Sequence, residues 1–589
     1  MRGIAIGVGV VLLLLVAAVA WVGFRALGAK DSLEKAQSLI GQLQDTVATD
    51  PAGAPELASR IEHETGHARD LTSDVVWRAA EFVPVLGKNL TVVRELAASV
   101  DDVATGAITP LAGVAPGLDP AALKPVDGRI DLAPLVAAAA PVERADTTLN
   151  EAAPRVDAID TNGALGQLQD AHARLAKLLG QAAELTTTAR QVVQLVPPML
   201  GADGPRNYLL VFQNNAEARS LGGNAASLLL LTVEDGRLQI TQQASSQDFR
   251  RSAEPPIPLD PNIYEVYYPQ FPNYVQDIAT RPDFPTMAQL GRGWWQRQFG
   301  LEVDGVISFD PVALASLLDA TGPIVLPTGE TLTSENAVQL LLSDAYVRYP
   351  DPDASDAFFA SAAASIFGAL TNGSPDPGKL LGALGFAADQ HRFLAWSAHP
   401  EEQQVLATTP LAGTLPSENT ASTTLGVYFN DQSASKIDYW VDSAVTATAE
   451  CPAGAPATYA ATFSLSSRLT PDQADALPSY VVSGWAGPQL FRTDVYVLGP
   501  VGGTFLDTSV GVPGLTNEVL SNGQDLGRPI VRLATNLAPG GSTTVTVRFQ
   551  LPADAAAGPL AVQTTPMVNP TTIEVGTDTC GRTPTPAGP

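Results

Sequence analysis

The chain has 589 residues, with 61 acidic and 34 basic side chains, and its formal net charge is −27 at pH 7. Proteins that bind nucleic acid present clustered basic surface, so this acidic composition argues against a nucleic-acid partner. Hydrophobic residues make up 45 % of the chain, which is enough for packed cores, and a chain of this length is expected to form about three or four domains.

An unbroken apolar run extends from Ile4 to Phe24, with basic residues on both sides. As a helix that rises ~1.5 Å per residue, the run would be roughly 30 Å long, which matches the hydrocarbon thickness of a bilayer. The apolar core of a removable signal peptide is shorter, about 7–15 residues, although the small residues at 26–29 leave cleavage open as an alternative. We therefore expect residues 1–30 to be a single-pass transmembrane anchor.

The flanking charges do not orient this anchor, because the two sides are almost equally basic. The chain contains two cysteines, Cys451 and Cys580, and both belong to a β-rich C-terminal segment. Such a pair suits a disulfide in an oxidising compartment, with two free buried thiols as the alternative. Together with the 47 prolines, the pair favours a protein of the cell membrane with the bulk of the chain extracytoplasmic.

Residues 31–200 are predicted to form a helical stalk or bundle, because apolar residues recur there at spacings of three and four. The clearest pattern is an a/d repeat over four heptads, which ends at Pro197 and Pro198. Its apolar positions are Leu168, Ala171, Leu175, Leu178, Ala182, Leu185, Ala189, Val192 and Val196.

Residues 201–425 are predicted to form an α/β core with a mixed sheet, because strand-like and helix-like segments alternate there. The strand-like runs are residues 208–212, 227–233, 237–240 and 305–309. Beyond residue 425 the helical period disappears, and short alternating strands between turns predict a β-sandwich over 426–582. Residues 583–589 are expected to be a disordered tail. The predicted fold class is therefore multidomain α+β.

Two motifs that suggest catalysis are better explained as ordinary structure. Residues 63–67 read His-Glu-Thr-Gly-His, a match to the zinc motif H-E-x-x-H, but both histidines lie opposite the apolar face of the predicted helix. Residues 373–380 nearly match the phosphate loop, but Leu380 replaces the Mg²⁺-binding hydroxyl, and Pro375 and Pro377 remove N–H donors. We expect no metal, nucleotide or other cofactor and assign no catalytic residue.

Polar residues follow directly after the strand-like run at 208–212. Ligands of open α/β sheets lie beyond the carboxyl ends of the strands, where amides, an arginine and a glycine pair could hold an anionic group. The alternative is a polar loop that only caps the sheet. The candidate ligand-binding residues in this segment are Arg206, Asn214, Asn215, Glu217, Arg219 and Asn224.

These residues belong to two longer segments with a family resemblance. The sequences NYLLVFQNNAEARSLGGNAASLLLLTVEDGRL, from residue 207, and VDGVISFDPVALASLLDATGPIVLPTGETLTSENAVQLLL, from residue 303, resemble the family called domain of unknown function 4012 (DUF4012). Residues 77–96 and 436–445 are also similar to that family. The resemblance implies a membrane-anchored protein of Gram-positive-type envelopes and brings no established activity.

A weaker resemblance is to the LytR-CpsA-Psr family, which transfers glycopolymers from polyprenyl pyrophosphate lipids to peptidoglycan with arginines and aspartates around the pyrophosphate and Mg²⁺. Arg219 stands where that family has the arginine of its Arg-Ser-Asp loop, and Asp248 stands near its Arg-Asp pair. Gln247 replaces the arginine of that pair, the aspartate of the loop is missing, and no arginine follows Asp356 as in the late arginine-rich motif. Each lost charge-assisted contact removes roughly 1.5–3 kcal/mol. Asp248 joins the candidate ligand-binding residues on this resemblance.

The sequence thus favours an envelope protein without catalytic activity that binds or organises cell-wall polymer or polyprenyl-linked glycan. One alternative is a divergent glycopolymer phosphotransferase that uses Arg219 and Asp248, so whether the chain is an enzyme stays open. Another is a structural or adhesion scaffold. A deep apolar cavity beside Arg219 would favour lipid binding, and a filled core would favour a scaffold. On the lipid-binding interpretation, Arg219→Ala is expected to weaken anionic-lipid binding without unfolding the chain.

Overall fold

The chain divides into two compact units, each described here by itself. The first comprises Met1–Lys124 with Ile130–Gly204, and the second comprises Pro125–Arg129 with Pro205–Pro589. The domain boundaries predicted within these units stay predictions. The computed structural model describes residues 2–84, 86–118, 125–126, 128–372, 376–452, 455–487, 489–510 and 518–579.

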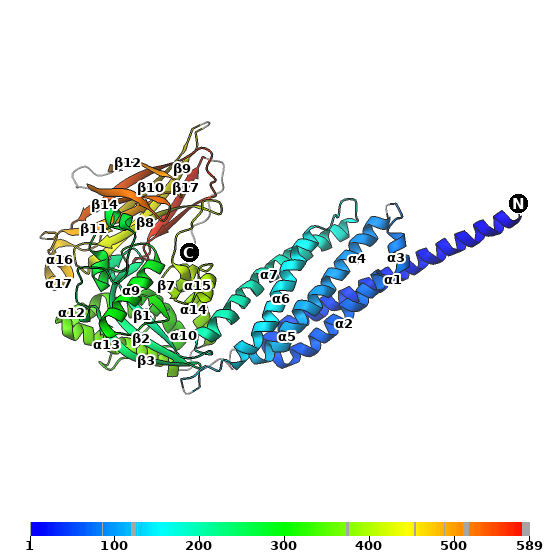
Figure 1. The fold of residues 1–589 in the computed structure, drawn as a ribbon, viewed down its shortest axis with the longest axis horizontal. Helices are drawn as coiled ribbons and strands as arrows, with labels where there is room; N and C mark the ends of the chain where they lie inside the picture. The colour runs from blue at the N-terminus through cyan, green and yellow to red at the C-terminus, as the bar shows by residue number, and fades with distance from the viewer. Residues whose placement is uncertain are drawn as a thin grey trace. The chain divides into compact units, whose positions relative to one another are not determined.

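The first unit is built from helices that pack side by side (Figure 1). The α-helices are α1 (Arg2–Thr49), α2 (Ala54–Thr72), α3 (Val75–Ala80), α4 (Leu86–Val103), α5 (Thr109–Val114), α6 (Ala133–Asp157) and α7 (Gly166–Met199). Alanine and leucine fill the core between α4, α6 and α7. Three of the nine predicted seam positions on α7, Leu168, Leu175 and Ala182, pack against this core. Leu178, Leu185 and Val192 are exposed.

The predicted transmembrane helix from Ile4 to Phe24 is wrong. In the part of the chain that the structure describes, no helix combines the length and the apolar composition needed to cross a membrane. Helix α1 runs well past the apolar run to Thr49, and the described end of that run packs within the helical unit, where Val22 is buried against Trp77. The side chains before residue 19, including that of Ile4, lie outside those described.

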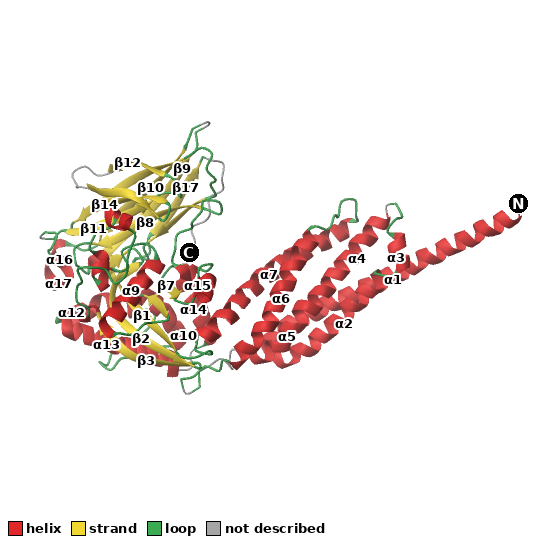
Figure 2. Ribbon diagram, viewed as in Figure 1, coloured by secondary structure: helices red, strands yellow, loops and turns green. Residues whose placement is uncertain are grey.

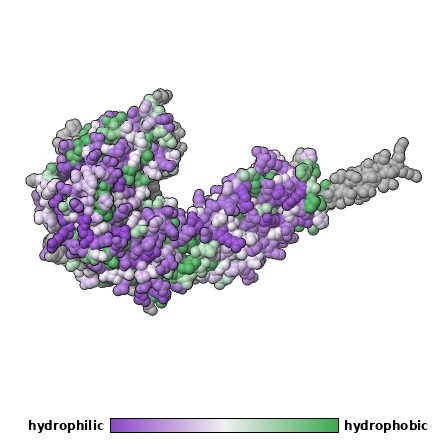
Figure 3. Space-filling model, viewed as in Figure 1, coloured by the Kyte–Doolittle hydropathy of each residue, from purple (hydrophilic) through white to green (hydrophobic). Residues whose placement is uncertain are grey.

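Hydrophobic residues gather at the end of the helical unit where the described side chains of α1 begin (Figure 3). Exposed apolar side chains in this part of the unit include Phe24 on α1, Val75 at the start of α3, and Phe82 in the turn that follows. Exposed apolar patches on folded proteins mark interaction surfaces more often than isolated exposed side chains do.

The second unit contains a mixed five-stranded sheet in the order β3-β2-β1-β4-β7. Strand β1 pairs antiparallel with β2 and parallel with β4, and β7 pairs antiparallel with β4. The strands are β1 (Arg206–Arg219), β2 (Gly222–Glu234), β3 (Arg237–Ser245), β4 (Gly305–Phe309) and β7 (Phe393–Ser397), with a small hairpin of β5 (Ile324–Val325) and β6 (Thr331–Leu332).

Helices pack around this sheet (Figure 2). They are α8 (Pro261–Val266), α9 (Phe284–Phe299), α10 (Pro311–Thr321), α11 (Ala337–Gln339), the π-helical turn η7 (Leu340–Asp344), α12 (Ala345–Arg348), α13 (Pro352–Asn372), α14 (Pro377–Asp389) and α15 (Pro400–Leu406). Helix α10 begins where Asp310 accepts a hydrogen bond from the Ala313 N–H, with Pro311 at the first helical position.

The C-terminal part of this unit forms two five-stranded sheets, ordered β12-β15-β10-β9-β17 and β13-β14-β11-β8-β16. Inward-facing residues of both sheets, such as Phe429 and Phe463, share one hydrophobic core. The strands are β8 (Thr423–Asp431), β9 (Val441–Glu450), β10 (Ala457–Ser467), β11 (Phe491–Leu498), β12 (Thr504–Val510), β13 (Glu518–Asp525), β14 (Arg528–Leu537), β15 (Ser542–Leu551), β16 (Leu560–Thr564) and β17 (Thr572–Asp578), with the short helices α16 (Pro471–Ala476) and α17 (Ser479–Val482).

The ends of β9 and β17 lie side by side because these strands pair in parallel. The Cys451 N–H, just after β9, donates a hydrogen bond to Thr579 Oγ1, just after β17, at 2.9 Å. Cys580 and the predicted tail at 583–589 lie outside the described residues. The disulfide between Cys451 and Cys580 therefore stays a prediction.

Candidate functional site

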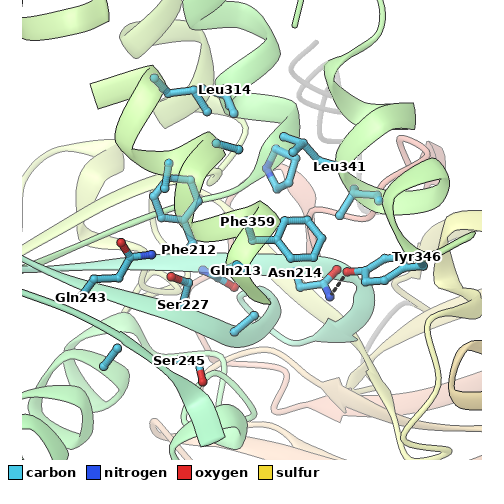
Figure 4. A pocket seen from close by; sticks show the side chains of 18 of the residues that line it. Phe212, Gln213, Asn214, Ser227, Gln243, Ser245, Leu314, Leu341, Tyr346 and Phe359 are labelled. Atoms are coloured by element: carbon cyan, nitrogen blue, oxygen red, sulfur yellow. Dashed lines mark hydrogen bonds between the residues drawn. The ribbon is translucent and has the colours of Figure 1, made fainter. Parts of the chain in front are cut away.

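A cavity of about 350 Å³ lies between one face of the β1–β3 sheet and the helical segments α10, η7 and α13. In Figure 4, apolar side chains from the sheet and from these helices, among them Phe212, Leu314, Leu341 and Phe359, point into the same space. Small-molecule sites in proteins span ~300–1,000 Å³ and are mostly apolar, so this first cavity is of a size and composition that can take a ligand. Its lining also includes Ala226, Ala244, Pro311, Leu342, Tyr346, Ala357, Ala362, Ala363 and Ile366.

One edge of the first cavity is polar, and its amides are already partly engaged. The Gln213 amide donates to Ser308 Oγ at 2.6 Å and accepts from the Gly223 N–H at 2.7 Å. The Asn214 amide donates to Tyr346 Oη at 2.7 Å and accepts from the Ala216 N–H at 3.1 Å (Figure 4). These bonds fix the shape of the edge. The other polar lining residues are Ser227, Gln243, Ser245 and Asp248, of which Gln243 and Asp248 are exposed.

The described lining of the first cavity offers no basic side chain to a ligand. Among the described residues that line it, Asp248 alone is ionisable at neutral pH, and no arginine, lysine or histidine takes part. Asp248 itself accepts a hydrogen bond from the Ser245 N–H at 2.8 Å and so caps the turn after β3. Across the described residues there is also no group of three or more side chains suited to hold a metal ion. The cavity therefore suits an apolar chain with a neutral or hydroxyl-bearing end.

The polar side chains of strand β1 point in different directions because the pairing of β1 with β2 is irregular. The register shifts after Phe212 and again after Asn214, and such bulges change the direction in which side chains point. Asn214 consequently lines the first cavity, whereas Glu217 and Arg219 are buried against the C-terminal strands.

Arg219 lies in a group that we call the buried ionic cluster. Its Nε and Nη2 donate to Asp277 Oδ1 at 2.9 and 2.7 Å, and its Nη1 donates to the Asp431 carbonyl oxygen at 3.2 Å. Glu217 forms an ion pair with Lys436 and accepts from the Asn224 amide at 2.7 Å. The buried ionic cluster comprises Glu217, Arg219, Asp277, Asp431, Lys436 and Asp438.

Burial and the charges of neighbouring groups shift the pKa values of three carboxyl groups in this cluster. Burial alone would raise the pKa of Glu217, but the charges of Lys436 and Arg219 hold that pKa below its ordinary value. Burial raises the pKa of Asp431, although Arg219 opposes the shift. Burial, reinforced by the charge of Asp431, raises the pKa of Asp438 well above its ordinary value. The cluster is a structural connection in which Arg219 donates to Asp277 and to the carbonyl oxygens of Ala218 and Asp431.

The remaining candidates also bind protein partners. The Asn215 amide donates to Asp310 Oδ2 at 2.8 Å and to the Pro566 carbonyl oxygen at 2.9 Å, which ties β1 to α10 and to the segment after β16. Arg206, at the start of β1, pairs with Glu402 at 3.4 Å and contacts His399. The seven predicted residues thus fall into separate places, and Asn214 and Asp248 are the two that line the first cavity.

The apolar half of the cavity was missed by sequence reasoning. It comes from η7 and α13, and α13 presents alanines, among them Ala362 and Ala363, where larger side chains would fill the space. The run of alanines in α13 is the sequence signal that could have indicated a cavity at this helix.

Comparison with known families bears on the same segment. Residues 203–346 match the family model described as "Protein of unknown function (DUF4012)". This part of the chain is similar to the DUF4012 family. The match contains β1–β4 and the cavity lining up to Tyr346, and α13 lies outside it. The resemblance expected at 77–96 and 436–445 is not covered by the match and stays a prediction. No curated protein matches the chain.

Proposed function

We propose that the segment matched by the DUF4012 model, together with α13, binds the apolar chain of a neutral, hydroxyl-bearing isoprenoid or glycan lipid of the cell envelope and performs no catalysis on it. The observation that carries the proposal is the first cavity, which is apolar on the side of α10, η7 and α13 and polar along Ser227, Gln243 and Asp248. A hydrocarbon chain gains about 0.8 kcal/mol for each CH₂ that it buries in such a space. Hydroxyl groups at the end of the chain meet the polar edge.

The phosphotransferase alternative has less support. It needs a cation near the pyrophosphate, and the described lining of the first cavity contains none. It also needs Arg219 and Asp248 at one site, but Asp248 lines the cavity whereas Arg219 is paired with Asp277 at 2.7 Å. An arginine already bound by a buried carboxylate has few donors left for a phosphate.

We place the second unit outside the cytoplasm. The support is the cysteine pair, because Cys451 and Thr579, the neighbour of Cys580, are joined by a hydrogen bond, and disulfides persist in oxidising compartments. A thiol count on the unreduced, denatured chain tests this placement. Absence of reactive thiol is expected, and two reactive thiols per chain would contradict it.

The binding proposal is tested by mass spectrometry of lipids extracted from the full chain after expression in an envelope-producing host. Ala363→Phe fills the first cavity, and the matched control Ala364→Phe makes the same change at the next, exposed position of α13. Excluding about two CH₂ groups from the cavity lowers affinity roughly tenfold. We expect a polyprenyl-type lipid with wild type and Ala364→Phe, and its loss with Ala363→Phe. Equal lipid content in all three proteins, or none in any, would contradict the proposal.

A further inference from the structure

Helix α7 carries a row of exposed apolar side chains. Leu178, Leu185 and Val192 follow one another at heptad spacing, and their exposed fractions are 61 %, 72 % and 45 %. A heptad is almost two helical turns, so the three side chains lie above one another on one face and span about 21 Å. Single exposed leucines are ordinary on protein surfaces, whereas a row at this spacing is the pattern through which two helices pair.

The other row of the same heptad pattern is already used within the helical unit. Leu168, Leu175 and Ala182 pack against the core that α7 shares with α4 and α6. The exposed row of Leu178, Leu185 and Val192, which we call the α7 row, lies outside that core and has no apolar cover among the described residues. Contact between such a row and water is unfavourable, so a second helix that covered it would be stabilised.

The charged residues beside the α7 row are complementary to themselves. Lys177 and Glu184, each directly before one of the two leucines, are exposed. If a second copy of α7 runs antiparallel about a two-fold axis between Leu178 and Leu185, each of these leucines meets the other leucine of the second copy. Lys177 then comes beside Glu184 of the second copy, and the symmetry forms this ion pair twice.

The parallel orientation does not fit these charges. In a parallel pair each side chain lies level with its own copy, so lysine meets lysine at Lys177 and glutamate meets glutamate at Glu184, and neighbouring like charges are destabilising. The antiparallel arrangement also places Val192 opposite Ala171, a small residue of the same predicted heptad pattern. The apolar row, the flanking charges and the side-chain sizes thus all favour one partner and one orientation.

We propose that two copies of the chain associate antiparallel along α7, with the α7 row as the apolar contact and ion pairs between Lys177 and Glu184 at its flank. The partner is a second copy because this face of α7 is complementary to itself in charge and in side-chain size. Helix α7 belongs to the helical unit and lines no part of the first cavity. This inference therefore does not rest on the function proposed for that cavity.

The test is sedimentation equilibrium of the full chain at micromolar concentrations, where wild type is expected to show a reversible monomer–dimer equilibrium. Leu185→Glu is expected to raise the dissociation constant about a hundredfold or more, because a symmetric interface loses the leucine twice. Its Tm should stay at the wild-type value, because the side chain is exposed. Phe82→Glu is the matched control, since it changes an exposed apolar residue in another part of the same unit, and it should leave the dimer intact.

An exchange of charges tests the orientation. Lys177→Glu and Glu184→Lys are each expected to weaken the dimer about tenfold, and the double variant that exchanges the two charges should restore wild-type association. A chain that stays monomeric at all concentrations overturns the proposal. So does a dimer that Leu185→Glu leaves intact or that Phe82→Glu abolishes. Single charge variants without effect, or a double variant that does not restore association, overturn the antiparallel pairing.

Discussion

The first cavity and the buried ionic cluster both draw on strand β1, yet they use its polar residues in opposite ways. At the cavity, Asn214 forms part of a polar edge beside open space. Five residues later, Arg219 is surrounded by protein groups that lie 58 and 212 residues away along the chain. A polar segment therefore indicates a ligand site only where the fold leaves its side chains lining an open cavity. Similar residue types in one strand line an open cavity at one position and form buried ion pairs at another.

The largest expected effect is on the buried ionic cluster. Arg219→Ala leaves Asp277 without its cationic partner and removes one of the two cations beside Glu217, which keeps Lys436. Removing one side of a buried ion pair costs about 3–5 kcal/mol. We expect the free energy of unfolding of the second unit to fall by that amount, measured by denaturant titration. This reverses the expectation drawn from the sequence, in which the same change spared the fold.

The control for this change is Arg250→Ala, at an exposed arginine, which should alter stability by less than about 0.5 kcal/mol. Lipid content per folded molecule should stay at the wild-type level in both variants. A stable Arg219→Ala protein that has lost its lipid would return Arg219 to the ligand site.

A smaller effect with a distinctive pH dependence is expected for Asp438→Asn. The pKa of Asp438 is raised by burial and by Asp431, so the folded state binds a proton that the unfolded state releases above pH ~4. The stability of the wild type should therefore fall as pH rises from about 4 through the folded-state pKa, by ~1.4 kcal/mol per unit of elevation. Asparagine cannot ionise, and its oxygen can still accept the Ala218 N–H that Asp438 Oδ2 accepts at 2.8 Å.

Denaturant titrations at pH 4 and pH 7 measure this effect. Asp438→Asn should be more stable than wild type at pH 7, and the difference should shrink toward zero near pH 4. Asp507→Asn, at an exposed carboxylate paired with Arg548, serves as the control and should show little change at either pH. A variant less stable than wild type at pH 7 would mean that the charge of Asp438 stabilises the cluster.

The smallest effect concerns the polar edge of the first cavity. Gln243→Leu removes an exposed amide from the lining and should change stability by less than about 0.5 kcal/mol. Loss of one hydrogen bond, about 1 kcal/mol, should weaken binding of a hydroxyl-bearing isoprenoid such as farnesol and leave a plain hydrocarbon unaffected. Gln239→Leu, on the same strand but outside the cavity, is the matched control. Equal losses for both ligands would assign Gln243 a role in packing only.

Local signals in the sequence indicated strands β1–β4 of the sheet that holds the first cavity, but not its fifth strand, β7. The run at 208–212 is continuously apolar, and the run at 305–309 is apolar except for Ser308. The two pair as neighbouring parallel strands from Tyr208 with Gly305 to Phe212 with Phe309. Hydropathy alone misjudged the N-terminal run, because it does not show that Val22 packs against Trp77 within the helical unit.

The site itself depended on contacts that no local pattern encodes. Glu217 pairs with Lys436, and Arg219 contacts Asp277 and Asp431. These residues are distant in sequence, and the fold brings them together. The first cavity exists because the face of α13 that meets the sheet carries small side chains such as Ala362 and Ala363. Sequence periodicity predicts the helix but not the orientation of that face.

The most direct test of the central claim is photo-crosslinking of the full chain with a diazirine-bearing isoprenoid alcohol, followed by peptide mapping. The account predicts labelled peptides within 340–366 and within strands β1–β3, all suppressed by Ala363→Phe and unchanged by Ala364→Phe. Labelling concentrated instead around Arg219 and 431–438, or unaffected by filling the cavity, would contradict it.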